Sequence, residues 1–280
     1  MKQISIILAC VLIQMLCACS SKLKSTQEQT KETEPRSEYI DSQEPVTIYI
    51  ANIGNLDRGE LAEKIEILQK FTPKAIGIDA VYKDRKDKAK DERLKEALNL
   101  RRNIVLGAFA EFKKNGQASG ITTTNHYFGD LPFGFCELTI NEDNEAECID
   151  KQINIKKKKT FYPLSAEVIR MFDPNAFEYY KNNTGEIYEF KYNENSDEEN
   201  INIVEIDFEE IRSNSDDLKK INDGIVLLGY LGNDQNTRHE KDSVDNFIYT
   251  DLSGKHIVKG VKIHAYIIGK ILNEYNKSKN

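Results

Sequence analysis

The sequence predicts an α/β fold of three layers, in which a mostly parallel sheet lies between helices. Apolar, β-rich runs at 46–53, 75–82 and 103–109 alternate with two segments of helical character. This order of elements requires parallel pairing with right-handed crossovers. The runs are also nearly continuous, as expected for strands that are covered on both faces. We therefore expect one domain, residues 46–276, without an internal repeat.

Local signals place the first two helices. Asp57-Arg58-Gly59-Glu60 has the spacing of a capping box, and Pro73 ends the helix that follows it. An apolar stripe at helical spacing supports this helix, and it consists of Leu61, Ile65, Leu68 and Phe71. The charged segment 84–99 carries Leu94, Ala97 and Leu98 and predicts the second helix.

The second half of the domain is less regular. Its predicted parts, in chain order, are a polar loop at 110–131, an inserted antiparallel β-hairpin at 133–155, a short helix in 161–174, short strands near 187–192 and 201–206, a polar helix around 207–221, a strong strand at 224–231, a polar excursion at 232–258 and a final helix from Gly260.

The N-terminus has the pattern of a bacterial lipoprotein signal peptide, residues 1–19. An apolar stretch is followed by Leu16-Cys17-Ala18-Cys19, which looks like a lipobox with cleavage before Cys19. The Cys19 thiol would take the diacylglyceryl group, and two or more acyl chains such as palmitate hold a protein stably on a membrane. An ordinary secretory signal or a signal anchor is the alternative. Residues 20–45 contain almost nothing apolar, so we expect a disordered tether.

Composition excludes some classes of function. The 280 residues carry a formal net charge of -7, which argues against a nucleic-acid binder that follows phosphates. The apolar content of 39 % is enough for one large core. There is no Gly-rich phosphate loop, no Gly-x-Ser-x-Gly elbow and no Cys/His zinc spacing, and so no cofactor is predicted.

Two cysteines lie beyond the predicted lipid site. Cys136 and Cys148 flank the sequence ELTINEDNEAE, and in a hairpin centred near Glu142 they would lie opposite each other. An extracytoplasmic compartment permits a disulfide, which would contribute about 3 kcal/mol. The alternative is two reduced thiols that pack as small apolar side chains.

Polar residues follow several predicted strands. Asn52, Asp79 and Asp234 stand at or just past strand ends, and ligands of open parallel sheets bind at the carboxyl ends of the strands. The carboxylates of Asp79 and Asp234 would suit Mg²⁺ or Ca²⁺, although caps on helices are the alternative. His264 shares the apolar stripe of the last helix, where it is either a structural histidine or an anion ligand.

Six short segments, in their order and spacing, resemble one known family. They are PKAIGID (73–79), IVLG (104–107), FGF (133–135), PLSAEV (163–168), GIVLLG (224–229) and GVKIHA (260–265). They are similar to the CHASE2 domain, the extracytoplasmic sensory module of bacterial adenylate cyclases, histidine kinases and Ser/Thr kinases. The resemblance covers most of 46–272.

The chain departs from the family pattern in places. Asn52 stands where the first strand of the family usually ends in Asp, and Lys259 replaces a Pro before Gly260. Family domains are normally followed by transmembrane helices and a cytoplasmic effector, whereas this chain ends at Asn280 with neither. The resemblance thus implies a sensing fold without an output of its own.

Together these observations predict a lipid-anchored, extracytoplasmic sensory module in the cell envelope, in the periplasm or on the cell surface. It would bind an unidentified small molecule at Asn52, Asp79, Asp234 and His264 and act through a membrane signalling partner, not as an enzyme. There are two alternatives. One is a metal-assisted hydrolase that uses the crevice expected between Asp79 and Asp234, and the other is a structural envelope lipoprotein.

Overall fold

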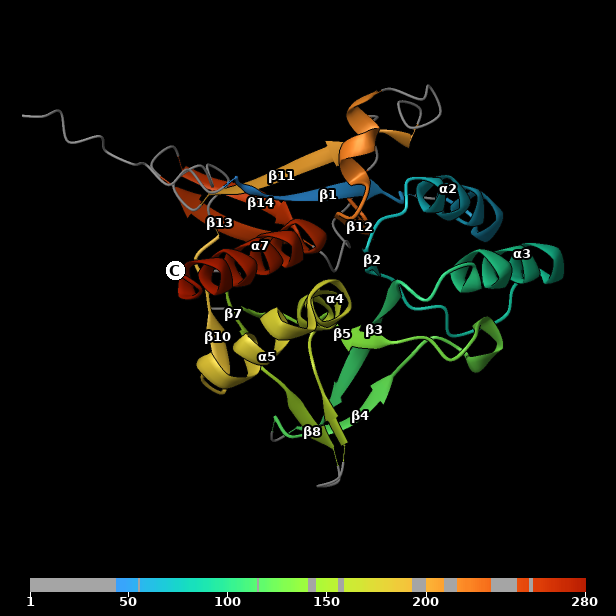
Figure 1. Cartoon of the computed structure of the whole chain (residues 1–280). Coiled ribbons are helices and arrows are strands. Elements are labelled where there is room, and N and C mark those ends of the chain that lie inside the picture. Colours follow the sequence, from blue (N-terminus) through green and yellow to red (C-terminus); the bar gives the residue numbers. More distant parts are fainter. Residues whose placement is uncertain are drawn as a thin grey trace, which may run out of the picture. The chain divides into compact units, whose positions relative to one another are not determined.

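A parallel sheet is the centre of the computed structural model, which describes residues 44–54, 56–114, 116–140, 145–155, 159–192, 200–208, 216–232, 246–251 and 254–280. All of these belong to one unit, Glu44–Asn280. The strand order is β11-β1-β12-β2-β3-β4, and β5 also pairs with β3 (Figure 1). The bounds are β11 (Ile201–Ile206), β1 (Val46–Asn52), β12 (Ile225–Gly229), β2 (Ala75–Ile78), β3 (Ile104–Phe112), β4 (Ala118–Thr122) and β5 (Phe133–Phe135). Every pairing is parallel except that of β3 with β4. The predicted α/β class is confirmed.

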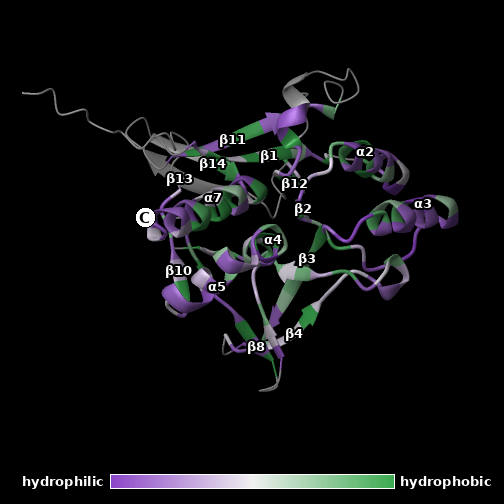
Figure 2. Ribbon diagram, in the orientation of Figure 1, coloured by the Kyte–Doolittle hydropathy of each residue, from purple (hydrophilic) through white to green (hydrophobic). Residues whose placement is uncertain are grey.

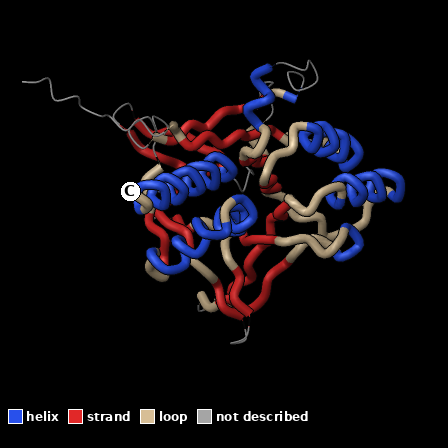
Figure 3. Tube along the Cα trace, viewed as in Figure 1, coloured by secondary structure: helices blue, strands red, loops and turns tan. Residues whose placement is uncertain are grey.

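Helices cover both faces of this sheet (Figure 3). Since side chains alternate along a strand, β1 directs Ile48 and Ile50 to one apolar core and Tyr49 and Ala51 to the other. The first core is closed by α4 (Leu164–Phe172), α5 (Pro174–Asn183) and α7 (Gly260–Ser278), and the second by α2 (Arg58–Lys70) and α3 (Lys88–Asn99). In Figure 2, α2 and α3 carry both hydrophobic and hydrophilic residues, as helices with one face on a sheet do.

The predicted capping box is present. The Asp57 side chain accepts hydrogen bonds from the backbone of Gly59 and Glu60, and the Glu60 carboxylate accepts one from the Asp57 backbone. The second helix begins later than predicted, at Lys88, because Asp87 is the residue that caps it.

Several regions differ from the prediction, and the helix α5 was not predicted. The segment 110–131 is not only loop, because β3 continues to Phe112, β4 follows it, and a short 3-10 helix forms at His126–Phe128. All five residues of β4 are half-buried, so this strand has no buried face that would produce an alternation of apolar and polar residues. The polar excursion contains an antiparallel pair, β13 (Asn246–Asp251) and β14 (Gly254–Lys259).

The segment 133–155 is not one hairpin. β5 joins the main sheet, whereas β6 (Thr139–Ile140) and β7 (Ala146–Asp150) form a separate sheet with β10 (Ile187–Glu189). β8 (Ile153–Ile155) pairs with β9 (Lys159–Phe161).

The cysteine prediction is corrected by this arrangement. Cys148 lies opposite Thr139 on one side and Glu189 on the other, while Cys136 follows β5 of the main sheet. Both are free thiols. The apolar run Phe133–Phe135 pairs with buried β3, and this pairing takes Cys136 out of the hairpin on which the predicted opposition depended.

Two of the predicted site residues, Cys19 and Asp234, lie outside the described residues. Among the helices that the structure describes, none combines the length and apolar character needed to cross a bilayer.

Candidate functional site

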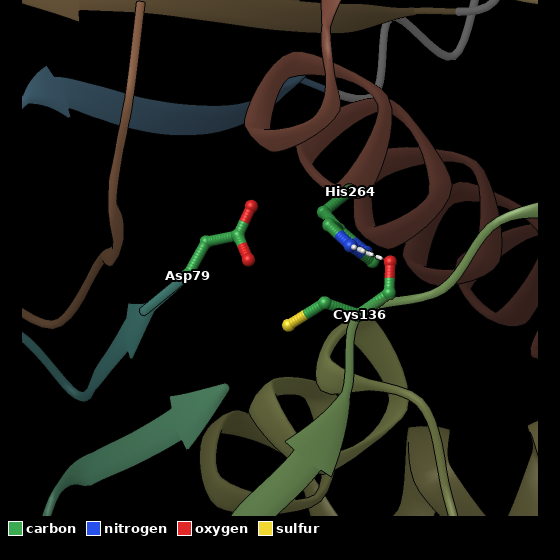
Figure 4. A group of neighbouring side chains, drawn as sticks. All are labelled: Asp79, Cys136 and His264. Atoms are coloured by element: carbon green, nitrogen blue, oxygen red, sulfur yellow. Dashed lines mark hydrogen bonds between the residues drawn. The ribbon is translucent and has the colours of Figure 1, made fainter. Parts of the chain in front are cut away.

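Three side chains from distant segments meet at the carboxyl edge of the sheet. Asp79 directly follows β2, Cys136 directly follows β5, and His264 lies in the second turn of α7. Figure 4 shows the carboxylate, the thiol and the imidazole side by side. One ligand-type atom from each residue lies within 4.8 Å of the others. We call Asp79, Cys136 and His264 the sheet-edge cluster.

Backbone hydrogen bonds fix where the cluster residues leave the sheet. The Asp79 N–H donates to the Leu228 carbonyl oxygen at 2.8 Å, and the Cys136 N–H donates to the Ala108 carbonyl oxygen at 3.0 Å. The predicted second strand therefore ends at Ile78, and Asp79 stands at the edge and not inside the core. The predicted position of Asp79 at a strand end is correct.

Two glycines make the close approach possible. A Cβ on Gly107 would lie 2.8 Å from the Cys136 sulfur, and a Cβ on Gly229 would lie 2.5 Å from the Val261 Cβ. Both distances are shorter than real contacts, so these positions need glycine. Gly229 thus lets the first turn of α7 pack directly on the end of β12, and this contact brings His264 to the edge.

His264 is 1 % exposed, as its place in the apolar stripe predicts. Its Nε2 lies 3.3 Å from the carbonyl oxygen of Cys136 (Figure 4). A carbonyl oxygen only accepts hydrogen bonds, so Nε2 carries the proton in this contact. The histidine is therefore a buried member of the cluster and links α7 to the segment after β5.

Negative charge and burial act together on the titratable groups of the cluster. Burial, and next the negative charge of Asp79, raise the pKa of the Cys136 thiol well above its usual value. Burial also raises the pKa of Glu137, and Asp79 adds to that shift. The Glu137 Oε1 accepts a hydrogen bond from the Ala110 N–H at 2.5 Å, whereas Oε2 is buried and has no hydrogen-bond partner among the described residues.

The Asn52 side chain is hydrogen-bonded to backbone groups. Its Oδ1 accepts hydrogen bonds from the N–H groups of Gly54 and Leu231, both at 2.9 Å, and its Nδ2 donates to the Gly232 carbonyl oxygen at 2.8 Å. The amide therefore holds the loop after β12 in a positioning role, and ligand binding by Asn52 stays a prediction. An aspartate could not supply the donor that Gly232 requires.

Sequence reasoning did not place Cys136 and Glu137 in the site. The signal was available, because FGF-Cys136 ends a buried strand in the same way as AIGI-Asp79 does. The sequence analysis interpreted Cys136 as one half of a possible disulfide and therefore did not consider it as a site residue. The pairing of Asp79 with Asp234 stays a prediction, since Asp234 lies outside the described residues.

The chemistry of the cluster favours binding over nucleophilic attack. A cysteine nucleophile needs a lowered thiol pKa, and here burial and Asp79 raise it. One sulfur, one nitrogen and carboxylate oxygens at the carboxyl edge of the sheet are, in contrast, atoms of the kind that hold a cation.

A hollow separate from the sheet-edge cluster lies beside α2 and α3. Its volume is about 560 Å³, and it is lined by residues 56–58, 81–84, 86–87 and Lys90. This volume is in the range of small-molecule sites. Its lining follows β1 and β2, so this hollow also belongs to the carboxyl edge of the sheet.

Comparison with known proteins gave one match. The model of the CHASE2 domain family matches residues 40–280 of the chain. No curated protein and no solved structure matches it.

Proposed function

This chain belongs to the CHASE2 family of extracytoplasmic sensory domains, and we propose that it is a lipid-anchored module that binds a ligand at the sheet-edge cluster and acts through a partner protein. The anchor would be the Cys19 thiol of the predicted lipobox. The tether at 20–45 would hold the domain away from the bilayer.

The convergence of Asp79, Cys136 and His264 is the observation that carries the proposal. These residues are far apart in the sequence, and the fold brings their polar atoms within 4.8 Å at the edge where open α/β sheets bind ligands. Glu137, next to Cys136 in the chain, keeps a buried carboxylate oxygen without a hydrogen-bond partner among the described residues, which is unfavourable unless a ligand or partner compensates for it. A binding role would account for this cost.

Ligand binding is tested by thermal unfolding of the purified full chain against divalent cations and a small-molecule library. A ligand at 100 times its Kd adds about 2.7 kcal/mol to stability. We expect a ligand that raises the Tm without being consumed, and an effect that is lost in Asp79→Asn while the circular dichroism spectrum is retained. Turnover of the ligand would favour the metal-assisted hydrolase. No stabilising ligand at all would favour a structural lipoprotein.

The anchor is tested separately in cells. We expect labelled palmitate to enter the chain and the protein to fractionate with membranes. Cys19→Ala should abolish both, whereas the matched variant Cys17→Ala should retain both. Retention of label in Cys19→Ala would contradict the predicted lipid site.

The partner is tested by chemical crosslinking in membranes. A protein crosslinked to the parent chain, with a yield that changes when the ligand is added, would support action through a partner. A yield that does not respond to the ligand would contradict it.

A further inference from the structure

We propose that the sheet-edge cluster is a site for a borderline divalent transition metal of the zinc class, with Cys136, His264 and Asp79 as its protein ligands. The identification of this ion as the sensed ligand rests on the proposed function, whereas the site itself does not.

The donor set selects the class of metal. Thiolate and imidazole ligands suit zinc and its neighbours, whereas Mg²⁺ and Ca²⁺ take six to eight oxygen ligands. The cluster offers one sulfur, one imidazole nitrogen and one carboxylate. The hard cations expected from Asp79 and Asp234 are therefore less well matched to the described residues than zinc is.

The geometry is close to that of a metal site. Zinc to ligand distances of roughly 2.0–2.3 Å in a tetrahedron place ligand atoms roughly 3.3–3.7 Å apart. The cluster atoms lie within 4.8 Å of one another, so a contraction of about 1 Å completes the site. Asp79 can supply it by side-chain rotation, because it is only partly buried and precedes an irregular segment.

The histidine already makes the second contact that metal ligands need. A metal-bound histidine characteristically donates its other ring N–H to a carbonyl or a carboxylate, and this contact fixes the orientation of the ring. His264 Nε2 makes it with the Cys136 carbonyl oxygen at 3.3 Å. The same short segment therefore supplies a sulfur ligand and the acceptor that orients the imidazole.

Charge gives an independent argument. Within the described part of the chain, neither Asp79 nor Glu137 forms an ion pair with a lysine or an arginine. Glu137 also keeps a buried carboxylate oxygen without a hydrogen-bond partner. A divalent ion would neutralise the Cys136 thiolate and Asp79. Its positive charge would also attract the carboxylate of Glu137, the residue that follows Cys136. Three protein ligands leave one position of a tetrahedron open, as in sites that exchange their ligands.

The experiment uses the full chain in detergent with Cys10, Cys17 and Cys19 replaced by Ser, so that only Cys136 and Cys148 remain. Zinc affinity is measured by competition with a chromophoric chelator, and Co²⁺ is used as a spectroscopic probe. We expect one ion per chain and a thiolate-to-cobalt charge-transfer band in the near ultraviolet.

The variants identify the ligands. Changes in groups that only support a ligand cost about 10–100-fold in metal affinity, so loss of Cys136 or Asp79 as a ligand should cost at least about 100-fold. Cys136→Ser should lose the cobalt band and Asp79→Asn should bind more weakly. Cys148→Ser, the matched cysteine control, should keep both the band and the affinity. If Cys136→Ser fails to fold, the band of Cys148→Ser still assigns the sulfur to Cys136.

Three results would overturn the proposal: no zinc binding by the folded chain, a band that disappears in Cys148→Ser, or equal affinity in Asp79→Asn and the parent. A small molecule that stabilises the chain through Asp79 while zinc does not bind would refute the metal site and keep the sensory function. Zinc binding without any response of a partner would keep the metal site and refute zinc as the sensed ligand.

Discussion

The sharpest test of the packing concerns Glu167 on α4. Its side chain is only 9 % exposed and lies 3.1 Å from Arg170, whose own side chain is 45 % exposed. Burial raises the pKa of Glu167 from 4.5 to about 7, and Arg170 opposes part of that shift. We therefore expect Glu167→Gln, which removes the charge and keeps the shape, to stabilise the protein at alkaline pH.

The sign and the size follow from proton linkage. Between the unfolded and the folded pKa the folded state binds more protons, so the free energy of unfolding falls as pH rises from about 4.5 to about 7. At 1.36 kcal/mol per unit, the ionised side chain costs about 3 kcal/mol above pH 7. Glu167→Gln should thus exceed the parent by about 2–3 kcal/mol at pH 8 and by less than about 1 kcal/mol at pH 5.

Urea unfolding followed by circular dichroism at pH 5 and pH 8 measures this difference. Glu178→Gln is the matched control, because Glu178 forms an i,i+3 pair with Lys181 at 2.8 Å and its side chain is 56 % exposed. It should change stability by no more than about 0.5 kcal/mol at either pH. If Glu167→Gln is less stable than the parent at both pH values, the pair with Arg170 outweighs desolvation and the reasoning is refuted.

Three further predictions concern the sheet edge. Asn52→Asp keeps two acceptor contacts but loses its donor, so the free energy of unfolding in urea should fall by about 1–3 kcal/mol, and an unchanged value would contradict the positioning role. Iodoacetamide should label Cys136 more slowly than Cys148 at pH 8, as measured by mass spectrometry, because burial and Asp79 raise the pKa of Cys136 well above its usual range. Gly107→Ala should destabilise the fold by about 1–3 kcal/mol and weaken zinc binding, whereas Gly185→Ala, where the added methyl meets nothing closer than 3.6 Å, should do neither.

Sequence reasoning succeeded where the signal was local. The capping box at Asp57 and the start of the second strand at Ala75 are both contained in a few consecutive residues, and both are present in the structure, although β2 ends at Ile78 and not at residue 82. β4 and the pair of β13 with β14 were not predicted, since their strands belong to segments interpreted as polar loops. Pairing between distant strands decides their structure, and a local pattern does not contain it.

The candidate site shows the same division. The sequence placed Asp79 at a strand end and His264 on a buried helical face. The end of the FGF run marked Cys136 as a polar residue at a strand end, but the sequence did not show that it lies beside Asp79 and His264, because its position depends on β5 entering the main sheet. It also gave no sign that the Asn52 amide bonds to three backbone groups, since two of these contacts, with Leu231 and Gly232, form only when the loop after β12 lies beside the end of β1.

The direct contact between Gly229 and Val261 has a mechanical consequence. It places the start of α7 on the sheet, and α7 extends for 19 residues, Gly260–Ser278, over about 28 Å. His264 lies close to the end of α7 that contacts the sheet. A tilt of about 3° at His264 would displace the far end, which is about 21 Å away, by about 1.1 Å, so a small movement at the sheet edge would become a larger one at the end of α7.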